Sequence, residues 1–108
     1  MSVTIQDHSA EVSAEIKAAL LRGLETCGLV AEGYAKKLAP VDTGNLRNSI
    51  THDVDDEELS AYIGTNVEYA PYQELGTIHM AAQPFLKPAV AEHANKYRKI
   101  IEKELKNG

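Results

Sequence analysis

The sequence predicts an α+β domain in which a long N-terminal helix and a C-terminal helix cover a small antiparallel sheet with a central β-hairpin. Three observations predict this class. Apolar residues recur with a helical period over residues 9–39, two runs with a period of two surround an acidic tip at residues 55–58, and a second helical period begins at Pro84. The chain of 108 residues fits one domain, which we place at residues 9–108 after a flexible N-terminal segment over residues 1–8.

The first helix carries a single apolar stripe whose members are three or four positions apart. They are Val12, Ile16, Ala19 or Leu20, Gly23 or Leu24, Cys27, Val30, Tyr34 and Leu38. Ser9 is the expected N-cap, and Pro40 ends the helix at about Ala39. A helix of about thirty residues would be roughly 45 Å long, which exceeds the width of a compact domain of this size. Two interpretations stay open: the helix bends near Gly28, where small residues make a packing contact, or part of its stripe contacts another subunit.

The central region predicts a β-hairpin. A turn-rich segment over residues 40–45 leads into a short helical turn at residues 46–49, for which Asp42 is the expected cap. Apolar and polar residues then alternate on both sides of the acidic tip, which is typical of two antiparallel strands with one buried face. The residues expected on that face are Ile50, His52, Val54, Leu59, Ala61 and Ile63. The acidic residues at 53 and 55–58 lack the frame of an EF-hand calcium loop and are expected to be solvated.

The last third of the chain predicts a short connector and the second long helix. Residues 67–72 indicate a short strand and then a helical turn that is entered through Pro71 and closed by Gly76. Residues 77–83 are expected to form a loop or an edge strand, and Pro84 begins the last helix. The inner stripe of that helix consists of Phe85 or Leu86, Val90, Ala94, Tyr97, Ile101 and Leu105. The same helix carries lysines at steps of three and four, which are Lys96, Lys99, Lys103 and Lys106. They are expected to form a solvated face or, alternatively, to contact an acidic neighbour.

Composition and charge argue against several classes of protein. Eleven basic and sixteen acidic residues give a net charge of −5, which disfavours a protein that binds nucleic acid by general phosphate attraction. No apolar run approaches the roughly 20 residues that span a bilayer, and the N-terminus has no signal-peptide pattern. Cys27 is the single cysteine, so we expect no internal disulfide and synthesis in a reducing compartment. The sequence thus predicts a soluble intracellular protein without membrane contacts or sequence-specific nucleic-acid contacts.

The chain shows no pattern typical of catalysis or metal binding. Asp42-Thr43-Gly44 is the tripeptide that carries the catalytic aspartate of aspartic proteases, and a dimer could pair two such aspartates. Its surroundings have helical periods, so a cap-and-turn role explains the tripeptide with fewer assumptions, and a dimeric aspartic protease is a remote alternative. The four histidines are far apart and lack the spacing of zinc ligands; they are His8, His52, His79 and His93. We therefore expect no enzyme, no cofactor and no metal.

Three segments carry a specific combination of motifs. The first has the pattern Pro-x-Asp-Thr-Gly-x-Leu-Arg at residues 40–47, the second has Tyr-Ala-x-Tyr-x-Glu-x-Gly-Thr at residues 69–77, and the third is Gln-Pro-Phe-Leu-Lys-Pro-Ala at residues 83–89. In this order and at this spacing they resemble a family of small neck or tail-component proteins of long-tailed bacteriophages, called the gene-product-ten family after a lambdoid phage. The motif residues are Pro40, Asp42, Thr43, Gly44, Leu46, Arg47, Tyr69, Tyr72, Glu74, Gly76, Thr77, Pro84, Phe85 and Leu86.

This resemblance implies a structural protein of a phage or prophage that acts through protein–protein contacts and without catalysis. Such a protein completes the tail or joins it to the head. The implied partners are adaptor, stopper or tail-tube rings, and self-association into a ring is expected on assembly. The implied location is the head–tail junction of the virion, after synthesis in the host cytoplasm. The alternative is a cytosolic protein-binding module that uses the stripe of its long helix.

The resemblance also implies that the motif residues serve the fold or an interface. Asp42 is expected to cap a helix, and Gly44 and Gly76 to supply turns. Phe85 and Tyr72 are expected to pack. A candidate interaction loop, with exposed apolar side chains, contains Ile78, His79 and Met80.

Overall fold

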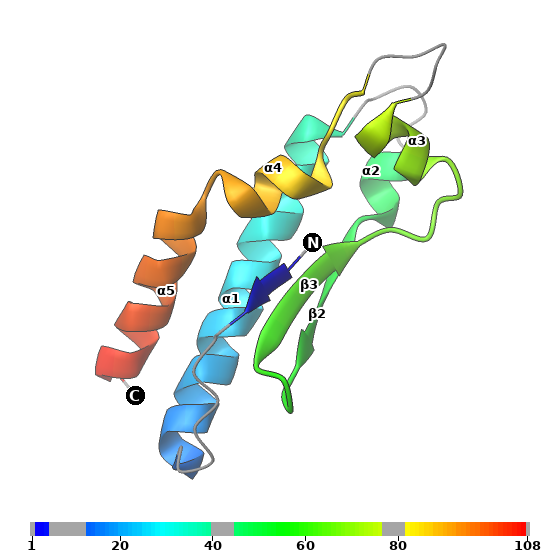
Figure 1. Ribbon diagram of the computed structural model, residues 1–108. Coiled ribbons are helices and arrows are strands. Elements are labelled where there is room, and N and C mark those ends of the chain that lie inside the picture. Colours follow the sequence, from blue (N-terminus) through cyan, green and yellow to red (C-terminus); the bar gives the residue numbers. More distant parts are fainter. Residues whose placement is uncertain (1, 5–12, 40–44, 77–81, 108) are drawn as a thin grey trace.

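The structure is a computed structural model in which residues 2–4, 13–39, 45–76 and 82–107 are described (Figure 1). Its elements are strand β1 (Ser2–Thr4), helix α1 (Ala14–Leu38), helix α2 (Asn45–Ser49), strands β2 (Thr51–Asp55) and β3 (Ser60–Gly64), and helices α3 (Ala70–Leu75), α4 (Leu86–Ala91) and α5 (Ala94–Asn107). The predicted α+β class is confirmed, with its long N-terminal helix, its hairpin and its C-terminal helical region. The molecule is elongated, with principal extents of 51 × 22 × 21 Å.

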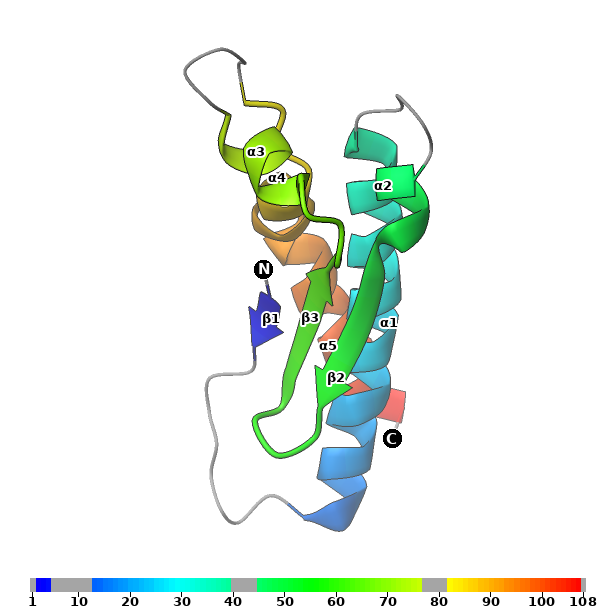
Figure 2. The same cartoon turned by 90° about the vertical axis from the view of Figure 1, so that its right-hand side faces the viewer.

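Helix α1 lies between the hairpin and α5 and follows the long axis of the molecule (Figures 1 and 2). Ser13 is its N-cap, because the Ser13 hydroxyl accepts a hydrogen bond of 3.2 Å from the backbone N–H of Ile16. The expected cap, Ser9, lies outside the described residues. The helix ends at Leu38 with Ala39 in an extended conformation, as the following proline favours.

The apolar stripe of α1 is covered within the same chain. Its buried residues are Ala19, Leu20, Gly23, Leu24, Cys27, Gly28, Ala31 and Ala35. The N-terminal half packs with Leu59 and Ala61 of the hairpin region, and the C-terminal half packs with Phe85, Ala89 and Tyr97. The stripe is therefore not free to pair with a host protein, and its large exposed members, Ile16 and Leu38, lie near the two ends of the helix.

Two glycines of α1 allow close approach of other elements, as one of the two interpretations predicts. A Cβ atom added at Gly23 would lie 2.7 Å from Cδ1 of Ile101 on α5, and one added at Gly28 would lie 2.8 Å from Cδ2 of His52 on β2. Both distances are shorter than a van der Waals contact. The helix continues through both glycines without a break over its 25 residues, so the small residues serve packing inside the chain.

The sheet has the strand order β1-β3-β2 and is antiparallel throughout. The predicted hairpin is confirmed, with His52 opposite Ile63 and Val54 opposite Ala61, so all four lie on the face that packs on α1. The expectation that residues 1–8 form a flexible segment is wrong for Ser2–Thr4, which pair with β3. Strand β3 pairs with β2 along one edge and offers backbone N–H and C=O groups along the other. A short strand can pair with that edge without an apolar period of its own, so the sequence gives no sign of it. The remaining residues of that segment lie outside the described residues.

The connector and the last helix differ from the prediction in two ways. Residues 65–69 form coil and turn, so the expected short strand is absent. The helical turn is present as α3, and Gly76 closes it with a positive φ of 77°. The expected single C-terminal helix is two helices, because α4 ends at Ala91 and α5 begins at Ala94.

Two contacts hold the chain at the break between α4 and α5. The Tyr97 hydroxyl of α5 donates a hydrogen bond of 2.5 Å to the carbonyl oxygen of Ala89 on α4, and the His93 ring stacks on Tyr34 of α1 at a centroid distance of 3.6 Å. The change of direction turns α5 along α1. It also leaves Ala94, which the sequence places on the inner stripe, exposed, together with Leu105.

Substitution of Gly28 by alanine is expected to destabilise the fold by about 1–3 kcal/mol, because the added methyl group overlaps the His52 ring. Gly33 is the matched control in the same helix, since nothing lies within 4 Å of a Cβ at that position. Gly33→Ala should instead stabilise by about 0.5–1 kcal/mol through helix propensity. Urea unfolding midpoints of both variants test this, and equal effects would contradict the close approach of β2.

Candidate functional site

The three motif segments lie at one end of the molecule, where α2 and α4 pack on α1 and α3 lies beside the start of α4 (Figures 1 and 2). Each segment contributes a buried residue to the same core cluster: Leu46 from the first, Ala70 from the second and Phe85 from the third. The Phe85 ring is fully buried. The motifs therefore assemble one packed region, which we call the motif end.

The Glu74 carboxylate joins the second motif to the third. Its Oε1 accepts hydrogen bonds from the backbone N–H groups of Phe85 at 3.1 Å and Leu86 at 2.9 Å, and its Oε2 accepts one from Lys87 at 3.1 Å. These are N–H groups that the first turn of α4 leaves without partners, and a carboxylate also suits the positive end of the helix dipole. Phe85 is the N-cap residue and has no side-chain cap of its own. Glu74 is thus the cap of a helix that begins twelve residues later.

The sequence contained a signal for this contact. None of residues 82–85, which precede α4, is serine, threonine, aspartate or asparagine, so the cap of the helix had to come from a distant residue. Sequence reasoning selected Glu74 as a motif residue without assigning this role.

The other motif residues divide into those that the structure describes and those that it does not. Tyr69 and Pro84 are exposed, Leu86 is partly buried, and the buried Nε atom of Arg47 has no hydrogen-bond partner among the described residues. The residues that lie outside the described part are Pro40, Asp42, Thr43, Gly44, Thr77, Ile78, His79 and Met80. The side chain of Tyr72 is likewise outside it. The Asp42 tripeptide connects helix α1 to helix α2, where an aspartic protease would require strands.

A shallow apolar hollow of about 490 Å³ lies beside the motif end, between the end of β3, α3 and the start of α4. Val67, Leu75 and Leu86 contribute to its lining, and Leu75 is 79% exposed. Such an exposed leucine beside a hollow is typical of a surface that contacts another protein.

A second cluster joins β2 to α1 through His52. The Nδ1 of His52 lies 3.0 Å from Oε1 of Glu32, and its Nε2 lies 2.6 Å from Oε1 of Glu25. Glu32 also pairs with Lys36 at 3.2 Å. The two glutamates flank Gly28 on the helix, which is the position where the ring approaches the backbone. Sequence analysis placed His52 on the buried face of the hairpin and excluded it as a zinc ligand, but it assigned the ring no partner.

The hydrogen bonds to Glu32 and then to Glu25 raise the pKa of His52 above its ordinary value of 6.5, against a smaller lowering by burial. Burial raises the pKa of Glu32, but the hydrogen bonds and charges of His52 and Lys36 outweigh it, so the pKa of Glu32 is lowered overall. Both shifts favour an imidazolium ion that donates a hydrogen bond to each of the two carboxylates. The cluster is a structural ion-pair bridge.

The thiol of Cys27 is not activated for chemistry. Cys27 is fully buried, and burial raises the pKa of its thiol to about 11, so the thiol stays protonated and is a poor nucleophile. Within the described ranges, no three histidine, cysteine, aspartate or glutamate side chains are grouped so that they could hold a metal ion. No helix there has both the length and the hydropathy to cross a bilayer.

Replacing Glu74 with alanine is expected to destabilise the fold by about 1–2 kcal/mol, because three backbone N–H groups of α4 lose their acceptor. Glu68, an exposed glutamate just before the second motif for which the described residues show no hydrogen bond, is the matched control. Glu68→Ala should change the stability by less than about 0.5 kcal/mol. Thermal unfolding followed by circular dichroism measures both, and similar effects of the two substitutions would refute the capping role.

The raised pKa of His52 predicts a specific pH dependence. The folded chain binds this proton more tightly than the unfolded chain, so the contribution to stability is fully present below about pH 6.5 and is lost as the pH rises through the folded-state pKa. The free energy of unfolding of His52→Gln should therefore decrease less than that of the wild type over this range. Urea unfolding at a series of pH values tests the difference. An NMR titration that placed the imidazole pKa at or below 6.5 would contradict the bridge.

Comparison with known proteins bears on the motif end. The model of the family described as "Bacteriophage HK97-gp10, putative tail-component" matches residues 4–76. This range contains the first two motif segments as far as Gly76, and therefore includes Glu74 but not the helix that it caps. No curated protein matches the chain, and no solved structure matches it.

Proposed function

This chain belongs to the HK97-gp10-like family of bacteriophage tail components, and from that premise we propose that it is a structural protein of the head–tail junction. In this role it completes the tail or joins it to the DNA-filled head, and it acts through protein–protein contacts without catalysis. Its partners are the adaptor, stopper or tail-tube rings, and it associates with itself into a ring during assembly. Its place is the junction of the finished virion.

The observation that carries this proposal is the use of the motif residues. Leu46 and Phe85 are buried in the core, and the Glu74 carboxylate is bound to three backbone N–H groups. In an enzyme, motif residues of this kind would be expected to face a pocket that admits substrate. Here Glu74 and Leu86 border the shallow apolar hollow, but the Glu74 carboxylate is already bound to the backbone of α4, where it holds a short helix and a connector in place. This supports a protein whose motifs preserve a shape that others bind.

The motif end is the surface that we assign to contacts with the other junction proteins. Glu74, which precedes residues 77–81 in the chain, binds the N–H groups of Phe85 and Leu86, which follow them, so the two flanking segments lie close together. The exposed Leu75 and the apolar hollow belong to these flanks. We assign Ile78, His79 and Met80 to the contact itself.

Deletion of the gene from the phage that encodes this chain is expected to leave DNA-filled heads separate from tails, or tails of uncontrolled length. Electron microscopy of the lysate measures this. Separate heads and tails of normal length would indicate joining, whereas a broad distribution of tail lengths would indicate completion of the tail. Normal joined particles would contradict both roles.

Complementation of the deletion with Ile78→Ser/Met80→Ser tests the assigned contact. The expected result is loss of joined particles with an unchanged circular dichroism spectrum of the purified chain, because the substitutions remove apolar contacts without shortening the segment that Glu74 closes. Ile16→Ser/Leu29→Ser is the matched control, since both side chains are exposed on α1 away from the motif end. Restored assembly by the first variant would remove the contact from the proposal.

A further inference from the structure

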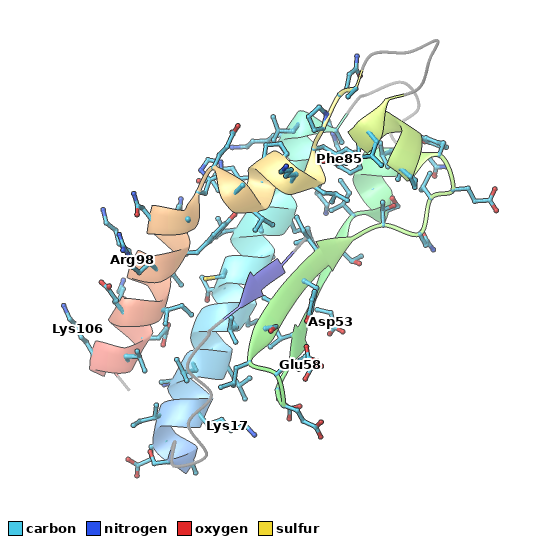
Figure 3. All side chains as sticks on the ribbon, in the orientation of Figure 1. Lys17, Asp53, Glu58, Phe85, Arg98 and Lys106 are labelled. Atoms are coloured by element: carbon cyan, nitrogen blue, oxygen red, sulfur yellow. The ribbon has the colours of Figure 1, made fainter. Side chains whose placement is uncertain are left out.

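Two surfaces of opposite charge lie on opposite sides of α1. Figure 3 shows Arg98 and Lys106 on the outer side of α5, whereas Asp53 and Glu58 extend from the hairpin beyond the other side of α1. The basic stripe of α5 consists of Lys96, Lys99, Lys103 and Lys106, all exposed. The acidic tip of the hairpin consists of Asp53, Asp55, Asp56, Glu57 and Glu58.

The basic stripe lies on a face of α5 that packs on no other helix or strand among the described residues. The opposite face of α5 contacts α1 through Tyr97 and Ile101, and the ion pair of Arg22 with Glu104 holds the same side. The steps of three and four place the four lysines in one row on the outer face. Among the described residues, none of these lysines forms an ion pair; the ammonium group of Lys96 lies over the Tyr34 ring, 5.5 Å from its centre.

The acidic tip is a turn held by its own hydrogen bonds and is shorter than the row of lysines. The Asp55 carboxylate accepts hydrogen bonds from the N–H groups of Glu57 at 2.9 Å and Glu58 at 3.0 Å, and the Tyr62 hydroxyl donates to Glu58 at 2.7 Å. These contacts fix the turn and leave the carboxylates of Asp56 and Glu57 directed to solvent. The row of lysines is about 15 Å long, and the strand end with its turn extends over roughly 10 Å.

We propose that the basic stripe of one copy of this chain binds the acidic tip of a second copy. This rests on the self-association in the proposed function and names the surfaces that produce it. Because α1 separates the two surfaces, one molecule cannot satisfy both by itself and instead binds one neighbour through each. Such a head-to-tail contact is heterologous, and it closes into a ring when the rotation between copies allows it. The net charge of −5 favours an acidic protein surface over nucleic acid as the partner of the stripe.

Charge reversal on each surface tests the proposal. Lys99→Glu/Lys103→Glu and Asp56→Lys/Glu57→Lys should each weaken self-association of the full chain by roughly ten-fold or more, because like charges then face one another. The second variant retains Asp55, which holds the turn. An equimolar mixture of the two variants should associate again, since each reversed surface then meets a complementary one. Sedimentation velocity measures all four samples, with the wild type as the fourth, and association should weaken as salt is added.

Lys17→Glu/Lys37→Glu is the matched control, because it changes the net charge equally at exposed positions of α1 outside the stripe. Equal loss of association in this control would overturn the proposal, and so would a mixture of the reversed variants that stays dissociated. The proposal is also wrong if the wild type is monomeric at low salt and high concentration.

The alternative partner of the stripe is double-stranded DNA. If the chain binds DNA, and Lys99→Glu/Lys103→Glu abolishes this binding but leaves self-association unchanged, the stripe is a DNA-binding surface instead. The deletion phage separates these failures from failure of the junction role, since its tail defect does not depend on which surfaces associate.

Discussion

The Glu74 carboxylate is the contact on which the motif end depends. It accepts hydrogen bonds from three backbone N–H groups at the start of α4. Without this carboxylate the short helix would begin with unpaired donors. The direction of α4 determines where Phe85 enters the core and where the chain turns at His93 to follow α1. One side chain thus connects the second motif, the third motif and the packing of the C-terminal helices.

Close packing on both sides of α1 depends on positions that carry no side chain. Gly23 admits Ile101 of α5, and Gly28 admits the ring of His52 from the hairpin. The cost of glycine in a helix, about 1 kcal/mol each, is offset by the burial that these approaches permit and, at Gly28, by the His52 bridge to the two flanking glutamates. The same helix therefore binds the sheet and α5 through different residues of one stripe.

The buried thiol and the histidine bridge among the described residues contribute to the stability of the fold, whereas the candidate contact surfaces are exposed. The single thiol is buried and protonated, and the paired histidine at β2 is held by two carboxylates. Three features face outward: the motif end with Leu75, the basic stripe of α5 and the acidic tip of the hairpin. An elongated molecule with separate exposed surfaces at one end and on two sides suits the subunit that we propose, which would bind both its own copies and other proteins.

The sequence by itself determined the α+β class, the long first helix, the buried face of the hairpin and the family. These follow from hydrophobic periods of 3.6 and 2 residues and from short motifs, all of which depend on residues that are close together in the sequence. It selected Glu74 and Phe85 as motif residues but not the bond between their segments. Only the tertiary structure decided that Ser2–Thr4 join the sheet, that the last helix divides before Ala94, and that His52 bridges two glutamates. Each of these involves groups that are distant in the sequence: a free strand edge, the Tyr34 ring that stacks on His93, and a carboxylate twenty residues from His52. A local sequence pattern cannot predict such contacts, because they form, and stabilise the fold, only after folding has brought the distant groups together.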